Sequence, residues 1–182
     1  MSVLVHRRWI VLLGLVAAAA CRGPAHPGPA PGPGPAAKAP EVAASENLLL
    51  DVTDVIWNQR HLDRLGEYYA ADVVRHVPEK REPITGLDAN REYIAAMQKA
   101  FPDLQVSTPR VIADGSWAAA EWVFAGHQKG DLPGVPATGR PVRLPGVSIV
   151  RIADGKVVEI WDYDDRLLLL YQLGVRPPAP PQ

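Results

Sequence analysis

Apolar residues recur every three or four positions through three stretches between residues 45 and 100, and this spacing is typical of amphipathic helices. The first stretch runs from Glu46 to Trp57, and the second covers residues 61–70. The third ends at Pro102, because proline cannot continue a helix. Between the second and third helices, residues 71–78 alternate between apolar and polar side chains, which predicts a strand.

After Pro102 the chain consists of long β-rich segments, and two Ala-Asp-Gly sequences mark tight turns between them. Helices followed by a run of antiparallel strands predict an α+β domain. The strands are too few to close a barrel by themselves. We therefore expect a strongly curved antiparallel sheet, with the three N-terminal helices on its concave side enclosing a cone-shaped cavity. A short C-terminal helix should follow the last strand.

The N-terminal 21 residues have the layout of an export signal. Arg7 and Arg8 precede an apolar run from Trp9 to Ala20, which is shorter than the roughly 20 residues of a membrane span. The only cysteine, Cys21, follows directly, at a position that resembles the lipobox of bacterial lipoproteins, where the cysteine becomes lipidated. An ordinary cleaved signal that happens to end before a cysteine is the alternative.

Composition divides the remaining chain into three parts. Residues 22–44 are rich in Pro, Ala and Gly and are expected to form a disordered tether, whereas residues 45–175 form the folded domain and residues 176–182 a disordered tail. The expected product is an exported bacterial lipoprotein that a lipid anchor holds to the membrane, with its domain facing the periplasm or the outer surface. Four of the 19 basic residues precede residue 41 but none of the 20 acidic ones does, so the domain is acidic. An acidic domain argues against a nucleic-acid partner.

The last strand ends in three aspartates directly before a run of leucines. On a regular strand one face would carry Val157, Glu159, Trp161, Tyr163 and Asp165. The other face would carry Val158, Ile160, Asp162 and Asp164. The pattern leaves open which face borders the cavity, because both carry apolar residues. Asp165 is interpreted either as the N-cap of the leucine-rich helix or as a general base in an apolar pocket.

Four segments carry a resemblance to a known family: residues 57–76, FPDLQV, residues 111–142 and residues 153–174. The specific parts of the last two are GDLPGVPATGRPV and the closing DRLLLLYQLG. Over about residues 46–175 the chain resembles the SnoaL-like polyketide cyclases and ester cyclases, which share the cone-shaped fold of nuclear transport factor 2. The resemblance implies that an aspartate near the start of the last helix is the catalytic acid and base. Counting back from Gly174, that residue is Asp165.

The resemblance also implies a histidine at the cavity rim, which is His76 here. Family members often read Gly-Thr-His-x-Gly where this chain has residues 126–130, so the usual histidine position is occupied by Gln128 and a histidine stands one residue earlier. That register change weakens the case for His127. The predicted substrate pocket consists of His76, Trp57, Trp122, His127, Glu159, Trp161 and Tyr163. The tryptophans are most simply core residues, which would still form aromatic walls.

Together these features favour a cofactor-independent acid/base enzyme that acts on a small apolar carbonyl compound. Asp165 would remove a proton α to the carbonyl, and His76 would stabilise the enolate oxygen. No metal motif is present, because the histidines lack ligand spacing and there are no paired cysteines. The alternatives are a non-catalytic ligand-binding lipoprotein of the same fold, and an isomerase or dehydratase that uses the same aspartate. Fold analogy further suggests a homodimer through the outer face of the sheet.

Overall fold

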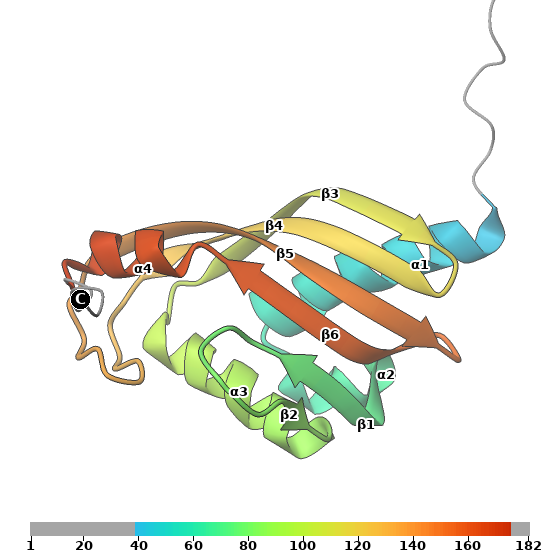
Figure 1. Ribbon diagram of the computed structural model, residues 1–182, viewed down its shortest axis with the longest axis horizontal. Coiled ribbons are helices and arrows are strands. Elements are labelled where there is room, and N and C mark those ends of the chain that lie inside the picture. Colours follow the sequence, from blue (N-terminus) through green and yellow to red (C-terminus); the bar gives the residue numbers. More distant parts are fainter. Residues whose placement is uncertain (1–38, 176–182) are drawn as a thin grey trace, which may run out of the picture. The chain divides into compact units, whose positions relative to one another are not determined.

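Six strands form one curved sheet in the computed structural model, which describes residues 39–175 (Figure 1). In chain order they are β1 (Tyr69–His76), β2 (Ile84–Thr85), β3 (Gln105–Asp114), β4 (Trp117–His127), β5 (Pro141–Ala153) and β6 (Lys156–Asp164). Their order across the sheet is β2-β1-β6-β5-β4-β3. Neighbouring strands are antiparallel except for β1 and β6, which run parallel. The α+β fold class is therefore confirmed, with one parallel pairing that the strand pattern did not predict.

The helices occupy the predicted regions but differ in their limits. They are α1 (Pro40–Asp51) with the π-helical continuation η1 (Val52–Asn58), η2 (Leu62–Arg64), α2 (Leu65–Tyr68), α3 (Leu87–Ala100) and α4 (Arg166–Leu173). The first helix begins at Pro40, so residues 40–44 are helical although we assigned them to the tether. Proline suits the first turn of a helix, where its missing N–H has no partner to lose. Ser45 Oγ also holds this end to the sheet by donating to the Gly115 carbonyl at 2.6 Å.

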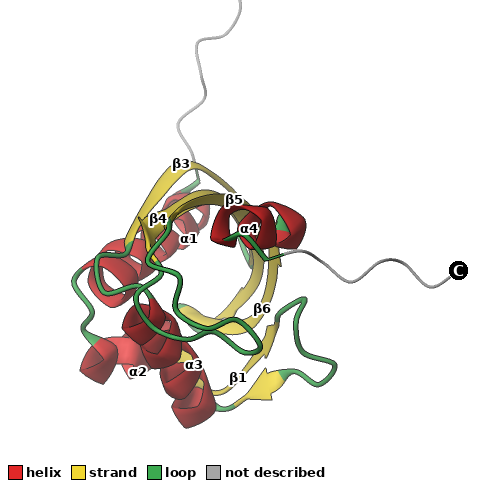
Figure 2. Cartoon of the chain, turned by 90° about the vertical axis from the view of Figure 1, so that its left-hand side faces the viewer, coloured by secondary structure: helices red, strands yellow, loops and turns green. Residues whose placement is uncertain are grey.

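The sheet curves because three of its strand pairs contain register shifts. An extra residue in one strand of a pair bends that strand and increases its twist. Figure 2 shows the strands curling around the inner space, with α1 and α3 on its other side. Apolar side chains of the helices pack inward against the sheet. The fully buried residues include Ile56 of η1, Leu65 of α2 and Ile94 of α3, together with Val73 of β1 and Phe101 just after α3.

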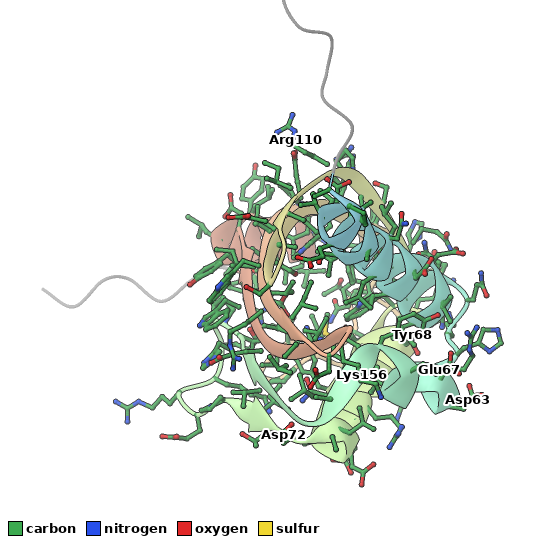
Figure 3. The ribbon with its side chains drawn as sticks, turned by 90° about the vertical axis from the view of Figure 1, so that its right-hand side faces the viewer. Asp63, Glu67, Tyr68, Asp72, Arg110 and Lys156 are labelled. Carbon is green, nitrogen blue, oxygen red and sulfur yellow. The ribbon has the colours of Figure 1, made fainter. Side chains whose placement is uncertain are left out.

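One hydrogen bond ties the start of β6 to α2. Lys156 Nζ donates to the Gly66 carbonyl oxygen at 2.6 Å. Figure 3 labels Lys156 beside Glu67 and Tyr68 of α2 at this end of the domain, whereas Arg110 of β3 projects from another part of the sheet. The bond therefore joins the first residue of β6 to a helix 90 positions earlier in the chain.

Gly146 leaves room for the indole ring of Trp122. The two residues are paired across β4 and β5, and a Cβ at position 146 would lie 2.2 Å from Trp122 Cη2. Replacing Gly146 with Ala should therefore displace the indole and lower the free energy of unfolding by about 1–3 kcal/mol. Gly66→Ala is the control, since its Cβ would meet only the flexible Leu87 side chain at 3.3 Å. Urea unfolding that gave the same stability for both variants would contradict this account.

The parts of the chain that carry the predicted export signal, Cys21, most of the tether and the C-terminal tail lie outside the described residues. Within residues 39–175, no helix is long and apolar enough to cross a membrane.

Candidate active site

The concave side of the sheet borders a cavity of about 120 Å³. One water molecule needs roughly 10–15 Å³ on this scale, so the space can hold several waters or part of an organic ligand. Most of its wall is apolar, and Trp57 of η1, Met97 of α3 and Trp122 of β4 contribute to it. The polar groups of the wall are Thr53, Tyr69, Arg75, Glu79, Tyr93, Ser148, Asp162, Asp164 and Arg166. An apolar cavity with a few converging polar groups is the usual form of a small-molecule site.

Two aspartates of β6 reach this cavity, and they are Asp162 and Asp164. Their i, i+2 spacing places both on the concave face of the strand. The pairing of β6 with β5 passes from Arg151↔Glu159 to Ile152↔Val157 and skips Val158, which is a β-bulge. Val157 therefore also lines the cavity, although strict alternation predicted that it shares a face with Glu159.

Asp162 is held by donors on both oxygens. Arg75 Nη1 donates to Oδ2 at 2.5 Å, and Ser148 Oγ donates to Oδ1 at 2.5 Å. The chain of donors continues to Trp122, whose Nε1 donates to Ser148 Oγ at 2.9 Å. Each oxygen of Asp162 thus accepts a hydrogen bond, one from a guanidinium and one from a hydroxyl group.

Arg75 is a buried cation, with only 3% of its side chain exposed. Burial alone would lower its pKa, but attraction to Asp162 outweighs this effect and holds the pKa above its ordinary value. Its Nε donates to Asn90 Oδ1 at 2.9 Å, and Asn90 Nδ2 donates to the carbonyl oxygens of Ile84 and Gly86. The guanidinium therefore connects α3, β1 and β6 at the polar end of the cavity.

Asp164 differs sharply from its neighbour two residues earlier. Its Oδ1 is buried and has no hydrogen-bond partner within residues 39–175. Burial raises the pKa of Asp164, the charges of Glu79 and Asp162 raise it further, and Arg166 opposes them. Two carboxylates thus lie in one site: Asp162 is paired with a guanidinium, and Asp164 has a bare oxygen and a raised pKa. This is a typical arrangement for acid/base chemistry.

Two tyrosine hydroxyls complete the polar set. Tyr93 Oη donates to Glu79 Oε1 at 3.3 Å, whereas Tyr69 Oη accepts a hydrogen bond from Arg75 Nη2 at 3.3 Å. Burial raises the pKa of both hydroxyl groups, so both are protonated at neutral pH.

Asp165 lies outside the cavity, so the predicted catalytic role does not fit its position. The residue is exposed, and its Oδ1 accepts a hydrogen bond from the Leu168 backbone N–H at 2.9 Å, which makes it the N-cap of α4. Strand β6 ends at Asp164, and the strand alternation cannot be extended into the turn that follows.

The contribution of this cap to stability can be tested. Asp165→Ala removes the acceptor and should lower the free energy of unfolding by about 1 kcal/mol. Asp165→Asn keeps a side-chain oxygen at the cap and should change stability much less. Equal losses for Ala and Asn in chemical denaturation would argue against the capping role.

Four residues of the predicted pocket lie on the outer face of the sheet instead. Arg75 and Val77 face the cavity, so His76 between them points outward, where its Nε2 lies 3.0 Å from Glu159 Oε1. The ring of His76 stacks on Trp161, with 5.2 Å between ring centroids, and Tyr163 is 55% exposed. The hydrogen bond with His76, and then Arg151, lowers the pKa of Glu159. His76, Glu159, Trp161 and Tyr163 therefore do not border the cavity.

His127 is also away from the cavity. It is exposed at the end of β4, where its Nδ1 lies 2.6 Å from Asp103 Oδ2, and hydrogen bonds with His127 lower the pKa of Asp103 to about 2. Gln128 is fully buried and holds the following loop through Val135, Pro136 and Thr138. Of the predicted pocket residues, Trp57 and Trp122 line the cavity.

Sequence reasoning missed Arg75, Asp162 and Asp164. One signal was available for Arg75, because it stands between Val73 and Val77 on an apolar strand face, and a charge at such a position needs a partner. The partner itself lies 87 residues away in sequence. Within residues 39–175, no group of three or more His, Cys, Asp or Glu side chains could hold a metal ion.

Comparison with known proteins gives consistent matches. The family model described as SnoaL-like polyketide cyclase matches residues 47–173. The aklanonic acid methyl ester cyclase DnrD of Streptomyces peucetius is 30% identical over 115 residues, which are 63% of this chain and 77% of that protein. The nogalonic acid methyl ester cyclase of Streptomyces nogalater is 28% identical over 119 residues, covering 65% and 89% of the two chains. A crystal structure from Jannaschia sp. CCS1 superposes with a TM-score of 0.71 at 22% identity, covering 78% of this chain and 99% of the other. At that identity the last similarity shows the fold alone.

Proposed function

Because this chain belongs to the family of SnoaL-like polyketide cyclases, we propose that it is a cofactor-independent acid/base enzyme that closes a ring in a small apolar carbonyl compound. One observation carries the proposal. The carboxylate of Asp164 faces an apolar cavity with a buried oxygen that has no partner within the described residues. A bare carboxylate with a raised pKa is suited to accepting a proton from carbon.

The proposed reaction is an intramolecular aldol-type addition. The Asp164 carboxylate takes a proton from the carbon α to one carbonyl group, and the electron pair of the broken C–H bond moves into an enolate. The enolate carbon then forms a carbon–carbon bond to a second carbonyl carbon of the same molecule, whose oxygen becomes an alkoxide. The carboxylic acid of Asp164 returns its proton to that alkoxide, so substrate and product are isomers and the enzyme is regenerated.

Asp162 is assigned a different task. Its charge is matched by Arg75 and both of its oxygens accept hydrogen bonds, so proton transfer to it would break the pair. In this proposal it keeps Arg75 and Ser148 in place at the polar end of the cavity. The apolar walls, which include Trp57, Met97 and Phe124, would bind the hydrocarbon part of the substrate.

Hydrogen–deuterium exchange tests the proposal without knowledge of the natural substrate. The purified full-length protein would be incubated in D₂O with aromatic keto-esters that carry an activated methylene group. We expect deuterium to enter the α-carbon faster than in buffer, detected by mass spectrometry, and ring closure in compounds of suitable length, detected by NMR. Ring closure separates a cyclase from an isomerase or dehydratase that uses the same first step.

Exchange at the buffer rate for the whole panel would contradict the proposal. Native mass spectrometry would then show whether the protein instead retains an unaltered ligand from the cell, as a non-catalytic binding protein should.

We further propose that the enzyme is exported and anchored through Cys21. In a bacterial host fed with an alkyne-labelled fatty acid, the full-length protein should become labelled and fractionate with membranes. Cys21→Ser should abolish the label, because serine cannot form the thioether to the lipid. A wild-type protein that is cleaved but carries no label would identify the ordinary cleaved signal instead.

A further inference from the structure

Resting on the proposed function, we infer that Tyr69 is a catalytic residue whose hydroxyl donates a hydrogen bond to the enolate oxygen formed when Asp164 takes the proton. Preorganised donors aimed at the position of a developing negative charge contribute strongly to catalysis in enclosed sites. His76 was expected to play this part, but it lies on the other face of the sheet.

Tyr69 belongs to the cavity wall, and its hydroxyl proton is not used. Tyr69 begins β1, lines the cavity and is only 3% exposed. Its Oη accepts from Arg75 Nη2 at 3.3 Å, which occupies an oxygen lone pair and leaves the hydroxyl proton unused. Within residues 39–175, the Tyr69 hydroxyl accepts this hydrogen bond and donates none. An oxygen atom of a ligand in the cavity would supply an acceptor.

Arg75 strengthens Tyr69 as a donor without contacting the substrate. Its Nη1 and Nε are committed to Asp162 and Asn90, and its third contact goes to Tyr69. A hydroxyl that accepts from a cation becomes polarised and donates more strongly in turn. Arg75 is therefore a positioning residue, with Tyr69 between its charge and the reacting oxygen.

The charge balance of the cavity also supports this assignment. Before the reaction, Asp162 offsets Arg75, Glu79 and Arg166 of the cavity wall have opposite charges, and Asp164 carries one further negative charge. Proton transfer moves that charge from Asp164 to the substrate oxygen, so the number of charges in the cavity does not change. The new oxyanion then needs a hydrogen-bond donor. The hydroxyl of Tyr69 can be that donor, because no group within residues 39–175 accepts its proton.

Tyr93 provides a matched control from the same cavity. Its hydroxyl is also part of the cavity wall, but it already donates to Glu79 Oε1 at 3.3 Å. Tyr69→Phe and Tyr93→Phe thus each remove one hydroxyl oxygen, but only the hydroxyl of Tyr69 is expected to bind the oxyanion.

Binding of 2-naphthol and related naphthols of increasing acidity would test the inference. At a given pH a more acidic naphthol ionises to a larger extent, and the hydroxyl oxygen of its anion carries negative charge as an enolate oxygen does. The full-length protein with Asp164→Asn would be used, since a neutral residue at 164 imitates the protonated aspartate of the enolate complex. Dissociation constants would be measured by fluorescence titration. We expect affinity to rise with the acidity of the naphthol.

In that background Tyr69→Phe should weaken binding of the most acidic naphthol about ten- to a hundredfold, the range for a hydrogen bond to a charged group. Tyr93→Phe should change it by less than about threefold. Equal effects of the two substitutions, or no binding of any naphthol to the Asp164→Asn protein, would overturn the inference. If Tyr69→Phe did not fold, as judged by circular dichroism, an affinity independent of acidity in the Asp164→Asn protein would overturn it.

The two proposals can fail separately. The wild type could exchange deuterium while Tyr69→Phe binds naphthols as tightly as before. This result would support the reaction and contradict the role of Tyr69. Alternatively, naphthol binding could depend on Tyr69 although the protein exchanges no substrate proton. This result would support the anion site and contradict the reaction.

Discussion

Asp164→Asn is expected to lower the rate of α-proton exchange by about a hundred- to ten-thousandfold, the range attributed to a single general base. Asparagine keeps the shape of the side chain but cannot accept the proton. Deuterium incorporation into the best keto-ester, followed by mass spectrometry at several enzyme concentrations, measures the change. The matched control is Asp165→Asn, which alters the adjacent carboxylate on the exposed side of the chain.

The control variant should exchange at the wild-type rate. If Asp165→Asn lost as much activity as Asp164→Asn, the base would have to be assigned to the helix cap, in spite of its distance from the cavity wall. If neither substitution reduced exchange, no carboxylate of this turn could be the base.

The pH dependence of exchange should follow from the same residue. A general base must be deprotonated to act, so the rate should rise with pH and level off above the pKa of Asp164. Burial raises that pKa above the ordinary value of 3.8, and the acidic limb should shift upward accordingly. A limb at or below the ordinary value would contradict the proposed burial of the charge.

Asp164→Asn should raise the free energy of unfolding at neutral pH, although it lowers the rate of exchange. A carboxyl whose pKa is raised in the folded protein stabilises the fold at a pH below its unfolded pKa, and this contribution is lost as the pH rises through the folded pKa. At neutral pH the wild type therefore carries the cost of a buried charge, which Asp164→Asn removes. The variant should be more stable than the wild type at neutral pH, with a gap that closes in acid, measured by urea unfolding across pH.

Asp162→Ala should have the largest effect on stability. It leaves the guanidinium of Arg75, which is 3% exposed, without its anion, and removing one partner of a buried pair typically costs about 3–5 kcal/mol. Urea unfolding monitored by tryptophan fluorescence would measure the loss. Glu121→Ala serves as the control, since it removes the partner of Arg110 from an exposed pair and should cost less than about 1 kcal/mol.

A double variant separates the buried charge from other causes. Arg75→Met combined with Asp162→Ala leaves no uncompensated charge in the cavity and should recover part of the stability that Asp162→Ala loses. A double variant less stable than Asp162→Ala would show that the aspartate stabilises the fold by some route other than its pairing with Arg75.

Several features of this protein follow from local sequence alone. The spacing of apolar residues between 45 and 100 predicted the three helical regions, because a helix needs an apolar stripe of its own wherever it packs. The β-rich segments after Pro102 and the two turns predicted the strands. The motifs from GDLPGVPATGRPV to the closing DRLLLLYQLG predicted the family. Asp165 ahead of the leucines also has the residue type of a helix N-cap, and it is one.

Which face of β6 borders the cavity depended on tertiary structure. Alternation divides the strand into two faces but does not say which is concave, and here both faces carry apolar residues. The choice came from the sheet, whose bulge at Val158 turns Val157, Asp162 and Asp164 to the same side. The ion pair of Arg75 and Asp162 likewise joins residues 87 positions apart, so no local pattern could reveal it. Local sequence determined which elements form, whereas long-range packing decided which carboxylate is buried without a partner, because burial is a property of the assembled sheet.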